Sequence, residues 1–462
     1  MKLGIKRTLA ASFLAIGTAL SPLALSAETL GDALASAYKN SGLLEQNRAN
    51  LRATDEGVAA AVALMRPTLS YSTSASYSSS TETWTKALTF SSSMALYTFG
   101  RNKLNIDAAK ETVLATRASL VAIEQNVLAD AVTAYMDVRY YDAQANLRAN
   151  SVRLMQQNLR AAQDRFEVGE ITRTEVSQVE AQLASARADL AVAQGQVSAA
   201  REVYKVAVGT YPSNLSSPPA VKTPVKTVEE AVQVARRTHP SIKALQHQIA
   251  ASDLAVEIAE RGLFPSVSAS ASRAFSSDFG ENAFDADNTT DSLSITASGT
   301  IYSGGNSASI IRESMANRDA ARATLLTTTR QIEQGVRTAW AMLSVYDASS
   351  QATEASVKAQ RVAYQGVKEE AELGASTTLD VLEAEQDLLD AQVSAIQARI
   401  NREAGIYTLL NAMGLMTVDH LKLNVPVYDP AAYYNAVKTA PSRNVSAEGA
   451  KLDRVLESLG RK

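Results

Sequence analysis

The stretch AELGASTTLDV at residues 371–381 places a glycine turn between two segments with helical periodicity. An earlier stretch, FEVGEITRTEV at 166–176, has the same form, with Gly169 in the place of Gly374. Glycine is well suited to reverse the chain where a helix ends, because it adopts the left-handed backbone conformation without steric penalty. Each stretch therefore predicts the tip of a helical hairpin.

Other landmarks also occur twice, and in the same order. The matching pairs are TLGDAL (29–34) with TVEEAV (227–232), MRPTLSYSTSAS (65–76) with LFPSVSASAS (263–272), LYTFGRN (96–102) with IYSGGNS (301–307), and AVGT (207–210) with AMGL (412–415). The offset is 198 residues for the first two pairs and 205 for the later ones, so seven extra residues lie within 276–291. Offsets this constant indicate a tandem duplication.

The duplication divides the chain into repeat 1 at 28–226, repeat 2 at 227–425 and a C-terminal tail at 426–462. We expect the polar tail to be poorly ordered. The predicted helices span 29–65, 102–166 and 172–208 in repeat 1, and 228–262, 306–371 and 376–413 in repeat 2. At ~1.5 Å per residue the longest would extend roughly 100 Å. An ordinary globular core needs no helix of that length, so these helices predict a coiled-coil tube or fibre.

Two predicted strands precede each long helix, at about 68–78 and 87–98 and at about 265–275 and 291–302. Leu69, Tyr71 and Tyr77 share one face of the first strand, and four serines share the other; Leu293, Ile295 and Ile301 lie opposite serines and threonines in the last. A sheet on a soluble core also alternates. However, strands of ~9–11 residues have the length that crosses a bilayer, and a face of small hydroxyl groups suits a water-filled lumen. The pattern favours a membrane β-barrel.

Four strands cannot close a barrel, because small barrels need about eight. An open edge in lipid would leave unpaired backbone groups at a cost of several kcal/mol each. Several chains must therefore share the barrel, and three copies would supply twelve strands. The fold class that follows is mainly α with a membrane β-barrel, built from tandem-duplicated helix–strand–strand–helix units.

The N-terminus predicts a secretory signal peptide at 1–27. Lys2, Lys6 and Arg7 precede a short apolar core, and Pro22 and small residues ending at Ala27 follow it. A retained membrane anchor is the alternative, but the apolar run is shorter than a spanning helix requires. The net charge of −3 provides no basic field for nucleic acid.

The residues give no sign of an enzyme, a cofactor or a metal site. The chain has no cysteine and three histidines. His239 precedes Pro240 where a helix should begin, which indicates a boundary residue. His247 lies eight residues further on, too far for an i, i+4 metal pair, and His420 lies beyond the last predicted helix.

The helices that follow the glycine turns each carry two stripes. In 376–400 a seam of mostly large residues with alternating spacings of three and four comprises Leu379, Leu382, Gln386, Leu389, Val393, Ile396 and Ile400. A second stripe, mostly small, comprises Ala384, Leu388, Ala391, Ala395 and Ala398. In repeat 1 the large residues are Val176, Val179, Leu183, Leu190 and Val197, and the small-residue stripe is Thr174, Ser177, Ala181, Ala184, Ala188, Ala191 and Gly195. Helices with two seams can pack on both sides, as the wall of a tube requires, although a soluble four-helix bundle could also show them.

The duplicated plan, together with VGEITRTEV and LGASTTLDVLEAEQDLL, resembles the TolC-like outer-membrane efflux protein family over about residues 28–415. The resemblance implies a homotrimer with a 12-stranded outer-membrane barrel continued by a periplasmic α-helical tunnel. It implies a passive exit duct of a tripartite efflux or type I secretion system. The implied partners are outer-membrane lipid, a periplasmic adaptor and an inner-membrane transporter, either ABC or proton-driven.

The same resemblance implies two kinds of site. The tips that contact the adaptor correspond to Val168, Gly169, Glu170, Leu373, Gly374 and Ala375. Two acidic rings at the constriction correspond to Asp380 and Glu383, and Glu175 occupies the matching position in repeat 1. Rings of carboxylates favour cations, and their mutual repulsion raises their pKa values; multivalent cations could also bind there and block the channel.

The acidic character extends further along this helix. Between Lys368 and Arg399 the chain has eight acidic residues and no basic one. Asp380, Glu383, Asp387 and Asp390 are spaced three, four and three, so they share a face. A solvated helix face usually mixes both signs. We therefore interpret this face as tunnel lining near the gate.

The chain departs from the family at two positions. Well-known members have a tyrosine before the second glycine turn and an arginine after it, which help to hold the tunnel shut; Ala371 and Ser376 stand here. We expect easier opening than in a member with both residues, measured as conductance in planar bilayers. Purified channels as tightly closed as such a member would refute this. A trimeric coiled-coil adhesin remains the alternative, although its strands would normally lie at one end of the chain.

Overall fold

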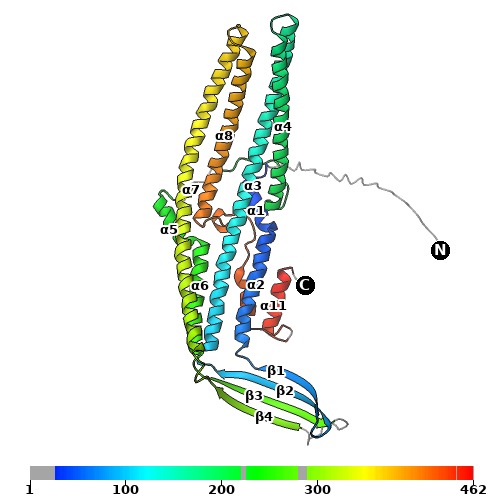
Figure 1. The fold of residues 1–462 in the computed structure, drawn as a ribbon, viewed down its shortest axis with the longest axis vertical. Coiled ribbons are helices and arrows are strands. Elements are labelled where there is room, and N and C mark those ends of the chain that lie inside the picture. The colour runs from blue at the N-terminus through cyan, green and yellow to red at the C-terminus, as the bar shows by residue number, and fades with distance from the viewer. Residues whose placement is uncertain (1–26, 220–224, 279–288, 444, 461–462) are drawn as a thin grey trace, which may run out of the picture.

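The computed structural model describes residues 27–219, 225–278, 289–443 and 445–460. The predicted signal peptide, apart from Ala27, and ten residues of the stretch 276–291, which holds the predicted insertion, lie outside these ranges. The molecule is elongated, with a β-sheet at one end and the tips of two helical hairpins at the other (Figure 1).

The two repeats have the same order of elements. Repeat 1 contains α1 (Leu30–Asn40), α2 (Gly42–Ala63), β1 (Thr68–Ser78), β2 (Thr83–Tyr97), α3 (Arg101–Glu167) and α4 (Arg173–Val208). Repeat 2 contains α5 (Val228–Thr238), α6 (Pro240–Arg261), β3 (Ser266–Asp278), β4 (Thr289–Ser298), α7 (Asn306–Glu372) and α8 (Thr378–Ala412). The predominantly helical, duplicated architecture is confirmed.

The first helix of each repeat is broken where the periodicity predicted one continuous helix. Ser41 accepts a hydrogen bond from the Leu44 backbone N–H and so caps α2. His239 caps α6 in the corresponding place, and Pro240 occupies the first helical position, where its missing N–H is no loss. Local capping therefore outweighed the continuous apolar pattern.

The long helices α3 and α7 contain 67 residues each, about 100 Å at 1.5 Å per residue. The main core lies where helices of both repeats meet. Leu34 of α1, Leu128 and Tyr135 of α3, Tyr204 of α4 and Leu410 of α8 are all buried there. The two tyrosine hydroxyls are satisfied, since Tyr135 donates to the Ser216 carbonyl at 2.7 Å and Tyr204 to Glu28 Oε1 at 2.6 Å. This core connects the two hairpins at their bases, while their tips extend away from it (Figure 1).

The four strands form one antiparallel sheet in the order β1-β2-β3-β4. The pairing of β2 with β3 joins repeat 1 to repeat 2, and β1 and β4 are the edges. One face carries paired hydroxyl groups, as in the contact of Ser70 with Ser91 at 2.8 Å. Leu69, Tyr71, Leu293 and Ile295 are exposed on the opposite face. An apolar face turned away from the core is what a lipid-facing wall requires.

Two details of the sheet differ from the expectation. β2 begins at Thr83 rather than near 87, and β4 ends at Ser298, so Ile301 lies beyond the strand. On the apolar face, Arg273 of β3 lies opposite Asp291 of β4. They form a bidentate ion pair, in which Nε donates to Oδ1 at 2.6 Å and Nη2 donates to Oδ2 at 2.7 Å. The pairing satisfies both charges at a position that the alternation predicted to be apolar.

The described part of the tail, 426–443 and 445–460, is ordered, contrary to the expectation. It contains α10 (Pro430–Val437) and α11 (Ala447–Ser458), and the short helix α9 (Val418–Leu421) precedes it at the end of repeat 2. Tyr433, Val437 and Leu452 pack with Ala59 of α2 in a small core, and the Tyr433 hydroxyl donates to Glu56 at 2.6 Å. The tail is polar in overall composition, but its helices carry a few apolar side chains at helical spacing, and these pack against α2.

Candidate functional site

The two hairpin tips have nearly identical backbone geometry. Gly169 and Gly374 adopt the left-handed conformation, with φ of 80° and 76°. The next residue folds back onto the helix end in each case: the Glu170 N–H donates to the Arg165 carbonyl at 2.9 Å, and the Ala375 N–H donates to the Glu370 carbonyl at 2.8 Å. These bonds satisfy carbonyls that the helix end would otherwise leave free.

Each tip presents one large apolar side chain to solvent. Val168 is 71% exposed and Leu373 is 85% exposed. The two tips lie at the same end of the molecule (Figure 1). The outer end of the helical structure therefore presents an exposed apolar side chain on each hairpin.

Reciprocal hydrogen bonds cap the helix after each tip. Thr172 and Glu175 form a capping box at the start of α4, and Thr377 and Asp380 form the equivalent box at the start of α8. The bond from the Thr377 backbone N–H to Asp380, 2.8 Å long, holds the pKa of Asp380 below its ordinary value. The Thr172 backbone N–H likewise lowers the pKa of Glu175. Both predicted site residues therefore stay charged while they also fix the start of a helix.

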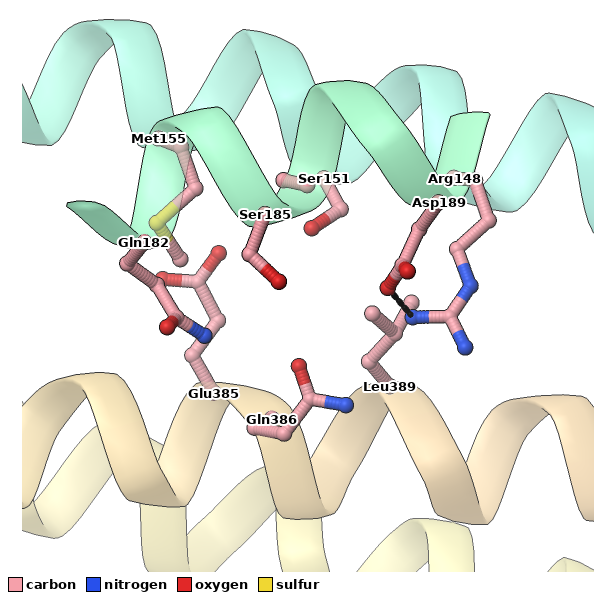
Figure 2. Close-up of a pocket in the computed structure, with 10 residues that line it drawn as sticks. Arg148, Ser151, Met155, Gln182, Ser185, Asp189, Glu385, Gln386 and Leu389 are labelled. Atoms are coloured by element: carbon pink, nitrogen blue, oxygen red, sulfur yellow. Dashed lines mark ion pairs between the residues drawn. The ribbon is translucent and has the colours of Figure 1, made fainter. Parts of the chain in front are cut away.

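The predicted acidic face of α8 is exposed in the chain, but its far end is partly neutralised. Asp380, Glu383, Asp387 and Asp390 are all exposed. Arg148 of α3 lies 3.8 Å from Asp390 and 3.3 Å from Asp189 of α4 (Figure 2). Among the described residues, the part of the acidic face without an ion pair is thus the part nearest the tip.

A groove of about 560 Å³ lies between the two tips. Ala371 and Ser376, the two departures from the family pattern, both line it. Ser376 donates to Glu370 of its own hairpin at 3.1 Å. The hydroxyl of Thr378 instead reaches across to Glu175 of the other hairpin at 3.2 Å. This bond connects the hairpins near the tips, in the same groove that Ala371 and Ser376 line.

Glu385 is the residue of this region that the sequence interpretation missed. It is only 5% exposed, whereas Asp380, Glu383, Asp387 and Asp390 of the same helix are exposed. Asn158 of α3 donates to Glu385 Oε2 at 3.0 Å, and Oε1 is buried without a hydrogen-bond partner. Burial raises the pKa of Glu385 to about 7, against the opposing effects of Asn158 and Lys368. A signal existed, because Glu385 lies three residues after Leu382 and four before Leu389, on the same helical face.

The histidines have structural contacts. In the described ranges, no group of three His, Asp or Glu side chains could hold a metal ion. His239 caps α6 as expected, and His247 Nδ1 lies 2.7 Å from Glu111. Among the helices that the structure describes, none is long and apolar enough to cross a membrane.

Known proteins with similar sequences or folds include outer-membrane efflux proteins and channels. The sequence profile of the family described as "Outer membrane efflux protein" matches residues 33–210 and 231–415. The outer membrane efflux protein BepC of Brucella suis is 35% identical over 441 residues, which are 94% of this chain and 95% of BepC.

Solved structures support the same fold. The CmeC outer membrane channel of Campylobacter jejuni matches with a TM-score of 0.75 and 16% identity, over 96% of this chain and 98% of CmeC. The outer membrane protein VceC of Vibrio cholerae matches with a TM-score of 0.71 and 21% identity, over 83% of this chain and 96% of VceC. None of these similarities supports the adhesin alternative. The chain belongs to the outer membrane efflux protein family.

Proposed function

We propose that three copies of this chain form the passive exit duct of a tripartite efflux or type I secretion system. The protein is an outer-membrane efflux channel with its helical tunnel in the periplasm. In the proposal, the transporter supplies the energy, a periplasmic adaptor connects it to the tips, and the duct itself performs no catalysis. The observation that carries the proposal is that each chain leaves unfinished surfaces that a second copy would complete.

The first unfinished surface is on the helices. Leu382, Leu389 and Ile400 of α8 are buried within the chain, where α8 lies against α3. The 205-residue offset maps them onto Ser177, Ala184 and Gly195 of the small-residue stripe on α4, which is exposed in the single chain. If the contact between repeats is repeated between chains, this stripe packs against α7 of the next copy, and its small side chains allow a close approach.

The second unfinished surface is the sheet. β2 pairs with β3 inside the chain, while β1 and β4 are the outermost strands of the sheet that the structure describes. Pairing of β4 with β1 of the next copy would repeat the β2–β3 junction and leave no edge exposed to lipid. Three copies of four strands give twelve, an even number that can close.

Ala184→Trp tests the proposed contact between chains. Ala184 is exposed in the single chain, so the substitution should leave the chain folded, while in the trimer the large ring would occupy the closely packed site that corresponds to Leu389. We expect the trimer band to be lost in semi-native electrophoresis of outer-membrane extracts.

Gln194→Trp is the matched control, because Gln194 is exposed on the same helix and its counterpart Arg399 is exposed as well. Trimers should form normally with this variant. Stable trimers of Ala184→Trp, or equal loss in both variants, would refute the proposed packing.

We propose further that Val168, Gly169, Glu170, Leu373, Gly374 and Ala375 contact the adaptor. Leu373→Asp should abolish cargo export and adaptor co-purification without changing the amount of trimer, because the 85% exposed side chain has no packing role in the chain. Val445→Asp changes a similarly exposed apolar residue of the tail and should export normally. Normal export by Leu373→Asp would show that the tip at Leu373 does not contact the adaptor.

A further inference from the structure

The two hairpins of one chain meet through a buried polar group. Glu385 of α8 extends towards α3 and α4 and lies near Met155, Gln182 and Ser185 (Figure 2). The space that these side chains line is about 10 Å³, at the lower limit of what a water molecule needs, and Oε1 of Glu385 is not exposed to it. Arg148 is directed at Asp189 and not at Glu385 (Figure 2). Asn158 is thus the hydrogen-bond partner of Glu385 across the contact.

The neighbours of Glu385 on its own helix show what this position could hold. Leu382 and Leu389 flank it on the same face, and both are buried. Leu382 joins the apolar cluster of Val152, Met155 and Val179 from the other hairpin. An apolar side chain at 385 would continue this seam, whereas the carboxyl group leaves Oε1 buried and unpartnered. A buried polar atom without a partner weakens the contact that encloses it.

We propose that Glu385 is a positioning residue that keeps the contact between the two hairpins weak, so that α8 separates readily from α3 and α4 when the periplasmic end opens. This inference rests on the proposed function, in which the duct opens at its tips. Asn158 limits the weakening by satisfying the other carboxyl oxygen. The contact that holds the hairpins together in the closed state therefore includes one carboxyl oxygen with a hydrogen bond, Oε2, and one without, Oε1.

Two substitutions should move the channel in opposite directions. Glu385→Leu removes the unpartnered oxygen and extends the apolar seam of Leu382 and Leu389. Asn158 would lose its partner, but it lines an open groove where water can replace the lost hydrogen bond. We expect the open probability of purified trimers in planar bilayers to fall roughly tenfold. Asn158→Ala leaves both carboxyl oxygens without a protein partner and should raise the open probability. Glu369→Gln, on the exposed side of α7 at the same end, should leave it unchanged.

The double variant Asn158→Ala with Glu385→Leu should behave like Glu385→Leu, because Asn158 has no role once the carboxyl group is gone. If Glu385→Leu does not assemble, Glu385→Met, with an unbranched apolar side chain, carries the same expectation. Equal open probabilities in the native and Glu385→Leu channels, or a shift of both single variants in the same direction, would overturn the inference. Native trimers that carry no current at all would overturn the duct proposal itself.

Discussion

Replacing Asp380 by Asn and Glu383 by Gln together should turn a strongly cation-selective channel into a weakly selective one. In the proposed trimer each substitution removes three carboxylates from one narrow level, so the local field that attracts cations is largely lost. We expect the permeability ratio of potassium to chloride to fall about tenfold, and block by multivalent cations to weaken by at least as much. Asn at 380 retains an oxygen that can accept the Thr377 hydrogen bond, so the helix start should be preserved.

The measurement is the reversal potential of single channels under a potassium chloride gradient, followed by titration with a trivalent cation. Glu448→Gln with Glu457→Gln removes the same number of charges from exposed positions in the tail and should leave selectivity unchanged. Unaltered selectivity in the Asp380/Glu383 variant would show that these carboxylates do not line the narrowest part of the pore.

Glu385→Gln should stabilise the protein at pH 8 and have little effect of this kind at pH 5. The pKa of Glu385 is about 7 in the folded chain against an ordinary 4.5. Between these values the folded state holds a proton that the unfolded state has released, so stability falls as the pH rises through this window. The loss is absent below pH 4.5 and complete above pH 7, with an upper limit of about 3 kcal/mol per chain.

The measurement is the temperature at which detergent-solubilised trimers dissociate and unfold, recorded from pH 5 to pH 8 for the native protein and for Glu385→Gln. Asp55, whose pKa burial raises to about 6, contributes a loss of the same sign in both proteins. The difference between the two curves isolates Glu385. Parallel curves over the whole range would mean that Glu385 is ionised in the folded protein without cost.

Long-range periodicity made most of the architecture predictable. The long helices end within one residue of their predicted limits because a glycine with positive φ lies just beyond each end. The two faces of the strands were predictable because serine and apolar side chains alternate with the period of a strand.

Contacts between distant segments were not predictable in the same way. Glu385 is hydrogen-bonded to Asn158, which lies 227 residues earlier. Arg148 of the other hairpin lies beside Asp390 and partly neutralises its charge. In the tail, spacing alone could not show that α2 would cover Tyr433 and Val437. These features need the three-dimensional arrangement of the hairpins, which a one-dimensional pattern does not contain.

In the proposed assembly, three chains close one duct whose narrowest level is lined by acidic side chains. Electron cryo-microscopy of the protein purified from outer membranes and held in a lipid nanodisc tests this most directly. We expect three copies around one axis, twelve strands in a closed barrel, and Asp380 and Glu383 directed into the lumen at the end of the tunnel opposite the barrel. A different number of copies, or these two side chains on the outer wall, would contradict the account.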